Sequence, residues 1–112
     1  KEPAGETVRF QCGSLHVDWE RHHVTVRGKP LQLTPKEFGL LKVLVEAKGR
    51  VRSREWLLEK VWGYDRAIDL ETRTVDFHVS QLRRKLGVES RRLVTIPSSG
   101  YRFLTEDEGS LP

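Results

Sequence analysis

The segment from Glu71 to Leu86 carries the clearest periodic pattern in the chain. Four apolar residues recur in it at intervals of four, three and four positions: Val75, Val79, Leu82 and Leu86. At about 100° of rotation per residue, this spacing places all four on one stripe of an α-helix, and Gly87 is suited to end that helix. Because an apolar stripe must pack on protein, the rest of the chain has to supply a core for it.

Two further helices are predicted before this segment. Thr34 and Glu37 have the spacing of a capping box, and Pro35 suits the first helical position. The residues that follow are apolar on nearly every side, as expected of a helix surrounded by protein, and Gly49 is placed to end it. Ser53 then caps a second helix that stops at Gly63, so only a short turn joins the two helices.

Short strands are predicted near both ends of the chain. Residues 8–26 are rich in Val, His, Arg and aromatic residues and are broken by turn residues, which favours short antiparallel strands. The strand Val24–Val26 enters a turn at Arg27–Pro30, and Leu31–Leu33 offers one more brief strand. Near the other end, Leu93–Ile96 and Tyr101–Leu104 flank turn residues and predict a β-hairpin. A polar loop is expected between Tyr64 and Leu70.

The order of strands, three helices and hairpin predicts an α+β domain of the winged helix-turn-helix type. With 112 residues the chain fits one domain, which we place at 8–104, after a linker at 1–7 and before a flexible acidic tail at 105–112. The absence of an initial Met predicts a piece of a larger protein. No apolar run exceeds three residues, so no membrane-spanning segment is expected, and the single Cys12 favours a reducing, cytoplasmic setting.

Phe77 occupies an unexpected place on the 71–86 helix. On a helical wheel it lies nearly opposite the apolar stripe, with Arg73 and Arg84 beside it and Ser80 and Gln81 flanking. A ring left in water forgoes about 2 kcal/mol of burial free energy, so we expect a partner to cover it. The major groove of DNA fits, because Phe packs on a thymine methyl, Gln bonds adenine, and Arg reaches guanine or phosphate.

Charge supports a polyanionic partner. The chain has a formal net charge of +4, and residues 71–92 hold six basic against three acidic side chains. A second basic cluster precedes the second helix: Lys48, Arg50, Arg52 and Arg54. Three other interpretations stay open on the residues alone, namely a solvated face with one stray aromatic, a protein-binding winged helix that docks through Phe77 and the 62–70 loop, and RNA binding.

The sequence offers little for metal binding or catalysis. His16, His22, His23 and His78 are not accompanied by a converging set of Cys or carboxylate ligands, so no metal site is expected. Ser98-Ser99-Gly100 lacks the strand-to-helix setting of a nucleophile elbow, and no glycine-rich phosphate loop occurs. We therefore expect neither an enzyme nor a cofactor.

Four motifs, in this order, closely resemble the effector domain of OmpR/PhoB-type response regulators. The residues that carry the resemblance are Leu33–Leu41, Gly49–Gly63, Arg73–Leu86 and Gly100–Phe103, and it covers about residues 8–104. It implies a four-stranded N-terminal antiparallel sheet, three helices and a C-terminal hairpin wing. It also implies a bacterial transcription regulator whose phosphorylated receiver domain lies outside this chain, with two effector domains bound in tandem on direct-repeat DNA.

The resemblance further implies roles for individual side chains. It assigns phosphate contacts to Arg73, Thr74, His78 and Arg83, and base contacts to Phe77 and Gln81. It places Trp62 close to the DNA backbone. Thr95 and Tyr101 are assigned to the wing. Together with Arg84, these are the expected DNA-binding residues. Residues 63–70 match the loop through which members of this family touch RNA polymerase.

The wing departs from the pattern of many relatives. Pro97-Ser98 stands where those relatives carry Arg-Gly, whose Arg enters the minor groove. Pro97 offers neither a charge nor a backbone donor. Minor-groove contact by the wing therefore does not follow from the resemblance, and Arg91, Arg92 and Arg102 are the candidates to compensate through phosphates.

Overall fold

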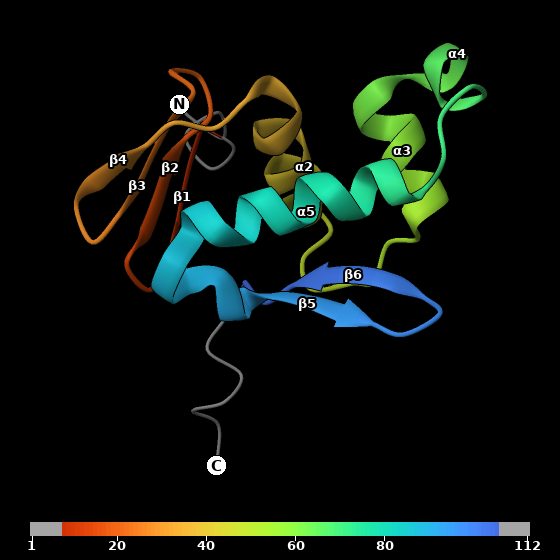
Figure 1. Cartoon of the computed structure of the whole chain (residues 1–112). Coiled ribbons are helices and arrows are strands. Elements are labelled where there is room, and N and C mark those ends of the chain that lie inside the picture. Colours follow the sequence, from red (N-terminus) through yellow and green to blue (C-terminus); the bar gives the residue numbers. More distant parts are fainter. Residues whose placement is uncertain (1–7, 106–112) are drawn as a thin grey trace.

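The computed structural model describes residues 8–105, drawn in colour in Figure 1. The predicted linker at 1–7 and the predicted tail beyond Thr105 lie outside the described residues. The elements are β1 (Arg9–Cys12), β2 (Leu15–Asp18), β3 (His23–Val26), β4 (Lys29–Leu31), α2 (Pro35–Glu46), α3 (Arg54–Trp62), α4 (Tyr64–Ala67), α5 (Arg73–Leu86), the 3-10 segment η1 (Gly87–Arg92), β5 (Leu93–Ile96) and β6 (Gly100–Phe103). The predicted α+β winged helix-turn-helix architecture, with its four-stranded sheet and hairpin wing, is confirmed.

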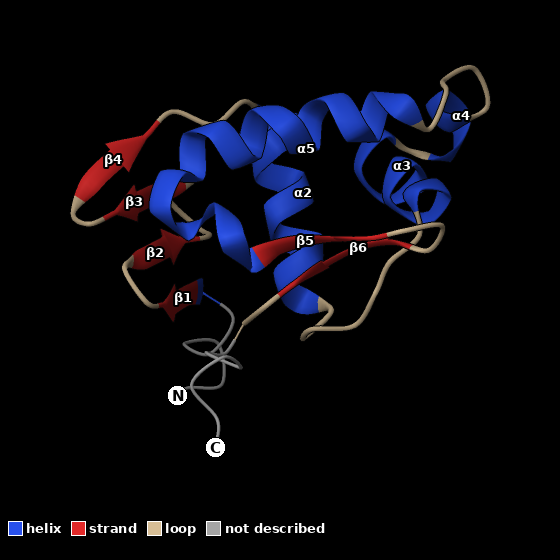
Figure 2. Cartoon of the chain, turned by 60° about the horizontal axis from the view of Figure 1, so that its bottom comes forward, coloured by secondary structure: helices blue, strands red, loops and turns tan. Residues whose placement is uncertain are grey.

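The four N-terminal strands form an antiparallel sheet in sequence order, at one end of the molecule (Figure 2). Val17 pairs with Phe10 on one side and with Val24 on the other, and Val17 and Val24 are buried. Their neighbours along the strands alternate toward the opposite, polar face. The apolar face of the sheet thus closes one side of the core.

Two local predictions need correction. The turn after β3 is shorter than predicted, because Pro30 belongs to β4, where an edge strand tolerates a residue without an N–H. The expected polar loop at 64–70 contains the one-turn helix α4, in which the amide of Ala67 donates to the carbonyl of Gly63. Between α5 and β5 the chain forms η1, a 3-10 segment that the sequence did not predict.

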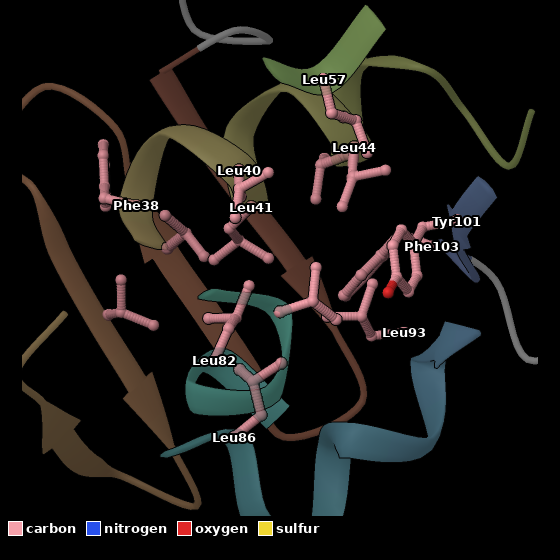
Figure 3. Close-up of a cluster of buried hydrophobic side chains, with 14 of the residues drawn as sticks. Phe38, Leu40, Leu41, Leu44, Leu57, Leu82, Leu86, Leu93, Tyr101 and Phe103 are labelled. Carbon is pink, nitrogen blue, oxygen red and sulfur yellow. The ribbon is translucent and has the colours of Figure 1, made fainter. Parts of the chain in front are cut away.

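The core gathers side chains from α2, α3, α5 and the wing (Figure 3). All four residues of the α5 stripe are fully buried, which confirms the pattern on which the prediction rested: Val75, Val79, Leu82 and Leu86. Leu40, Leu41 and Leu44 of α2 meet them from one side, and Phe103 of β6 closes the cluster. Each such side chain contributes about 1.5 to 3 kcal/mol by leaving water, so α5 is fixed mainly by this packing.

The predicted capping box is present, and its Glu37 also contacts α5. The amide of Glu37 donates to Thr34 Oγ1 at 3.2 Å, and the amide of Thr34 donates to Glu37 Oε1 at 2.9 Å. Lys85 of α5 adds an ion pair to the same carboxylate at 2.7 Å. Burial raises the pKa of Glu37, but the bonds from Lys85 and Thr34 outweigh burial and lower it. The start of α2 is thereby tied to the end of α5.

A buried ion pair joins the base of the wing to the N-terminal sheet. Arg92 Nε donates to Glu89 Oε1 at 2.6 Å, and Glu89 also accepts from the amide and the hydroxyl of Ser14, between β1 and β2. Burial raises the pKa of Glu89, but the bonds from Ser14 and Arg92 outweigh it and lower the pKa to about 2. The cluster therefore favours the ionised carboxylate in the folded chain.

Acid should weaken this cluster, and Glu89→Gln should reveal its share. Since the unfolded carboxyl takes up its proton near pH 4.5 and the folded one only near pH 2, the Glu89 contribution of up to about 3 kcal/mol is present above pH 5 and is lost as the pH falls toward 2. Urea unfolding at several pH values measures it. Glu89→Gln should flatten the fall of the free energy of unfolding at acidic pH. The exposed control Glu59→Gln should leave that fall unchanged. A fall that is the same in Glu89→Gln and wild type would contradict this role.

Candidate nucleic-acid interface

The outward face of α5 is polar and cationic, with an aromatic ring at its centre. Phe77 is 60% exposed, whereas Val75 and Val79, two positions away on either side, are fully buried. The prediction that Phe77 projects away from the core is confirmed. One turn further along, Gln81 is half-buried and Arg84 is exposed, and Arg84 Nη1 donates to Gln81 Oε1 at 3.2 Å.

An aromatic cluster adjoins Phe77 at the start of α5. The ring of His78 meets Trp62 edge to face, at 4.9 Å between centroids, and Phe77 at 5.4 Å. His78 Nδ1 lies 2.8 Å from the carbonyl oxygen of Thr74. Because a carbonyl oxygen only accepts, Nδ1 is the donor in this bond, and Nε2 is left as the other polar atom of the ring. Four of the predicted site residues are thus brought together.

Arg73 is loosely held at the N-terminus of α5. Its Nε lies 3.0 Å from Glu71 Oε1, and the side chains of Arg73 and Glu71 are 84% and 75% exposed. An ion pair this exposed contributes little, because water and salt screen it. The guanidinium of Arg73 can therefore change partners at small cost.

Arg83, in contrast, makes its hydrogen bonds to other residues of the protein. Its Nε and Nη2 donate to the carbonyl oxygen of Leu93 at 3.1 and 2.9 Å, and Nη2 donates to Thr95 Oγ1 at 2.6 Å. The guanidinium also lies 5.6 Å from the ring centre of Tyr101. The side chain thus fastens β5 to α5, and its phosphate contact stays a prediction.

Tyr101 lies in the wing as expected, but its side chain points inward. It is only 6% exposed, and its hydroxyl donates to Asp76 Oδ1 of α5 at 2.6 Å. Burial and the hydrogen bond to Asp76 raise the pKa of Tyr101 to about 12. In this arrangement the residue joins β6 to α5, which does not test the predicted DNA contact of Tyr101.

Asp76 is the residue that the sequence did not single out. Besides Tyr101, its carboxylate binds Arg54 of α3 through two bonds, from Nε to Oδ1 at 3.1 Å and from Nη2 to Oδ2 at 2.9 Å. Burial raises the pKa of Asp76, and the bonds from Tyr101 and Arg54 lower it further than burial raises it. One carboxylate thus joins α3, α5 and the wing.

The tip of the wing borders a cleft of about 230 Å³ beside the start of α3. Residues on its two sides include Ser53 and Arg54 of the α3 start and Ser98 and Ser99 of the tip. The wing approaches closely because Gly100 has no side chain: a Cβ there would collide with the carbonyl oxygen of Arg52, which accepts the amide of Tyr101 at 3.0 Å. Pro97, Ser98 and Ser99 are exposed and carry no charge.

Comparison with known proteins identifies the family. Residues 28–103 match the family model described as "Transcriptional regulatory protein, C terminal". The chain is 42% identical over 102 residues to the phosphate regulon transcriptional regulatory protein PhoB of Rhizobium meliloti, covering 89% of this chain and 44% of PhoB.

Two solved structures have the same fold. The DNA-binding domain of RstA from Klebsiella pneumoniae, in complex with the RstA box, has a TM-score of 0.74 at 30% identity and covers 87% of this chain and 97% of its own. The Thermotoga maritima OmpR/PhoB homologue DrrB, a response regulator, has a TM-score of 0.77 at 31% identity, covering 87% of this chain and 44% of its own.

The chain belongs to the OmpR/PhoB family of response-regulator effector domains. It spans less than half the length of PhoB and DrrB.

Several cations of this effector domain already have contacts within the protein. Arg92 is 1% exposed and paired with Glu89, so the expectation that it compensates through a phosphate is wrong. In the second basic cluster, the Arg52 guanidinium lies 4.7 Å from the Trp56 ring centre, and Arg50 Nε donates to the carbonyl oxygen of Ala47 at 3.1 Å. Arg102 is half-buried near Gly49. Of the second basic cluster, Arg50, Arg52 and Arg54 thus each have a contact within the protein.

The residues between Val8 and Thr105 include four histidines and one cysteine. In that range of the effector domain, no three His, Cys, Asp or Glu side chains are grouped as metal ligands. No helix within the same range has the length and apolar character needed to cross a membrane.

Arg83→Lys should loosen the wing of the effector domain. A lysine cannot supply both the two bonds that converge on the carbonyl oxygen of Leu93 and the bond to Thr95, so we expect a loss of about 1 to 2 kcal/mol in the free energy of unfolding. The substitution should also increase the rate of amide hydrogen exchange more in β5 and β6 than in α2. Arg84→Lys, one position along on the exposed face, is the matched control and should stay within about 0.5 kcal/mol of wild type. Equal effects of the two substitutions would contradict the role of Arg83 in holding β5 to α5.

Proposed function

We propose that this effector domain binds double-stranded DNA in a sequence-specific manner, with α5 in the major groove and the β5–β6 wing on the flanking backbone. The observation that carries the proposal is the exposed ring of Phe77 on the polar, cationic face of α5. Support comes from RstA, whose similar DNA-binding domain was solved in complex with the RstA box.

The shape of α5 favours duplex DNA as the partner. The 14 residues of α5 make a rod about 21 Å long, and a major groove about 12 Å wide admits such a rod. Because Val75 and Val79 are fixed in the core, the helix presents Phe77 and Gln81 to base edges as one rigid surface. The deep, narrow major groove of A-form RNA would not admit these side chains.

The contacts divide into base and backbone contacts. Phe77 packs on a thymine methyl and Gln81 bonds adenine, which gives sequence preference. A second set binds phosphates, which fixes position on the duplex: Trp62, Arg73, Thr74, His78 and Arg84. Because Nδ1 of His78 already donates to Thr74 and a phosphate oxygen only accepts, His78 meets a phosphate through Nε2 in its doubly protonated form. Thr95 and Arg83 set the position of the wing.

The wider role is that of a cytoplasmic two-component transcription regulator. A receiver domain elsewhere in the full protein would be phosphorylated and would bring two effector domains together in tandem on direct-repeat DNA. The 63–70 segment is proposed to touch RNA polymerase, and the exposure of Tyr64 and Ile68, at 68% and 70%, supports a protein contact there. The shared family and the partial coverage of the longer relatives support this role.

Titration of random-sequence duplex at low and high salt tests the proposed function first. Binding that weakens steeply as salt rises is expected, because phosphate contacts release counterions. Selection of bound sequences from a random duplex pool should then yield a consensus. Absence of duplex binding at low salt, or preference for single-stranded RNA over duplex DNA, would overturn the proposal.

Phe77→Ala and Gln81→Ala should each relax base preference. We expect each to cost about 1 to 3 kcal/mol on the selected duplex and much less on random duplex, because only base contacts are lost. Fluorescence anisotropy with both duplexes measures the difference. Gln11→Ala, on the outer face of the N-terminal sheet, is the control and should change neither affinity. Equal losses on both duplexes would count against base recognition.

Arg73→Ala should weaken binding to every sequence alike. Loss of one phosphate contact should reduce the slope of log K against log salt by about one unit. Arg9→Ala removes an equally exposed cation from the far sheet and should leave the slope as it is. A wild-type slope in Arg73→Ala would exclude the phosphate contact.

A further inference from the structure

Arg54 presents a cation beside the proposed DNA surface, yet its charge is already matched. It is the first residue of α3 and lines the cleft next to the wing tip. Its side chain is 45% exposed, and two of its nitrogens bind the two carboxylate oxygens of Asp76. A paired arginine of this kind keeps its place at the surface without offering a free charge.

The carboxylate of Asp76 is itself held in place. The hydroxyl of Tyr101, fixed in the core, donates to Oδ1 at 2.6 Å. Asp76 immediately precedes Phe77 on α5, whose opposite face is anchored by Val75 and Val79. The carboxylate therefore cannot follow Arg54 outward if that side chain swings toward solvent, and the pair breaks before Arg54 can reach another anion.

Arg73 and Arg54 both lie near the start of α5, but their contacts differ. Arg73 has a single contact with the highly exposed Glu71, while Arg54 has a two-pronged contact with the Asp76 carboxylate, which is 32% exposed and also accepts from Tyr101. Two parallel charge-assisted bonds are stronger and more directional than one screened contact. Arg73 is thus available to a phosphate, and Arg54 is withheld.

We propose that Asp76 is a specificity-determining positioning residue that withholds Arg54 from the DNA backbone. The inference rests on the proposed DNA binding by α5. Each cation that reaches a phosphate strengthens binding to all sequences, because the counterion term carries no sequence information. Restraint of Arg54 lowers the affinity for random DNA and keeps recognition dependent on base contacts from Phe77 and Gln81.

A purely structural role for Asp76 makes the opposite prediction. If Asp76 served only to fasten the wing through Tyr101, its loss would weaken binding to selected and random duplex together. Tyr101→Phe tests that contribution alone, because it removes the hydroxyl and leaves the bonds between Asp76 and Arg54.

Asp76→Asn is the direct test, measured by anisotropy with selected and random duplex over a salt series. The amide keeps the shape and an acceptor for Tyr101 but removes the charge that holds Arg54. We expect affinity for random duplex to rise about three- to tenfold at low salt, with a salt slope steeper by about one unit. The ratio of selected to random affinity should fall. The double variant Asp76→Asn with Arg54→Gln should return the slope to that of wild type, and Tyr101→Phe should leave it unchanged.

Arg54→Gln alone provides a second test that does not depend on the stability of Asp76→Asn. Its salt slope should equal that of wild type, since Arg54 makes no phosphate contact while Asp76 holds it. A slope reduced by about one unit would show that Arg54 already binds phosphate and would overturn the inference. Equal weakening of binding to both duplexes by Asp76→Asn, or an unchanged slope in that variant, would also overturn the inference.

The wild-type protein separates failure of the proposed function from failure of this inference. If wild type bound no duplex at any salt, the proposed function would fail and this inference with it. If wild type binds duplex and any of the contradicting results is found, the inference alone is overturned.

Discussion

Burial of the apolar stripe of α5 is the interaction on which the rest of the structure depends. Val75, Val79, Leu82 and Leu86 are each fully buried among side chains from α2, α3 and the wing. Fixing one face of the helix fixes the rotation of the opposite face, so Phe77 has to lie in solvent. The outward ring is therefore a consequence of core packing and not of local flexibility, which is why it points to a partner surface.

Electrostatic pairing decides which cations take part in that surface. Lys85 binds Glu37, Arg83 binds the wing, and Arg92 is buried with Glu89. These side chains hold elements together, and a net charge of +4 gives no sign of the difference. Among the cations of α5, Arg73, with its weak surface pair, and the exposed Arg84 are the ones left for a polyanion. The cationic face of α5 is therefore narrower than its four basic residues suggest.

The sequence predicted what local pattern controls and missed what depends on distant contacts. The α5 stripe and the capping box at Thr34 involve residues within a few positions of each other, and both are present. The inward positions of Tyr101 and Arg83 depend on how the wing crosses α5, and the contacts of Asp76 join residues 22 and 25 positions away. Motif resemblance named Tyr101 and Arg83 but did not show which way they point.

Intermolecular nuclear Overhauser effects between the domain and its selected duplex test the central claim most directly. If α5 lies in the major groove, the ring protons of Phe77 should show contacts to a thymine methyl or to other major-groove base protons, while the outer face of the N-terminal sheet shows none. Contacts from Phe77 to no base, with DNA contacts instead on that sheet or on α4, would contradict the account.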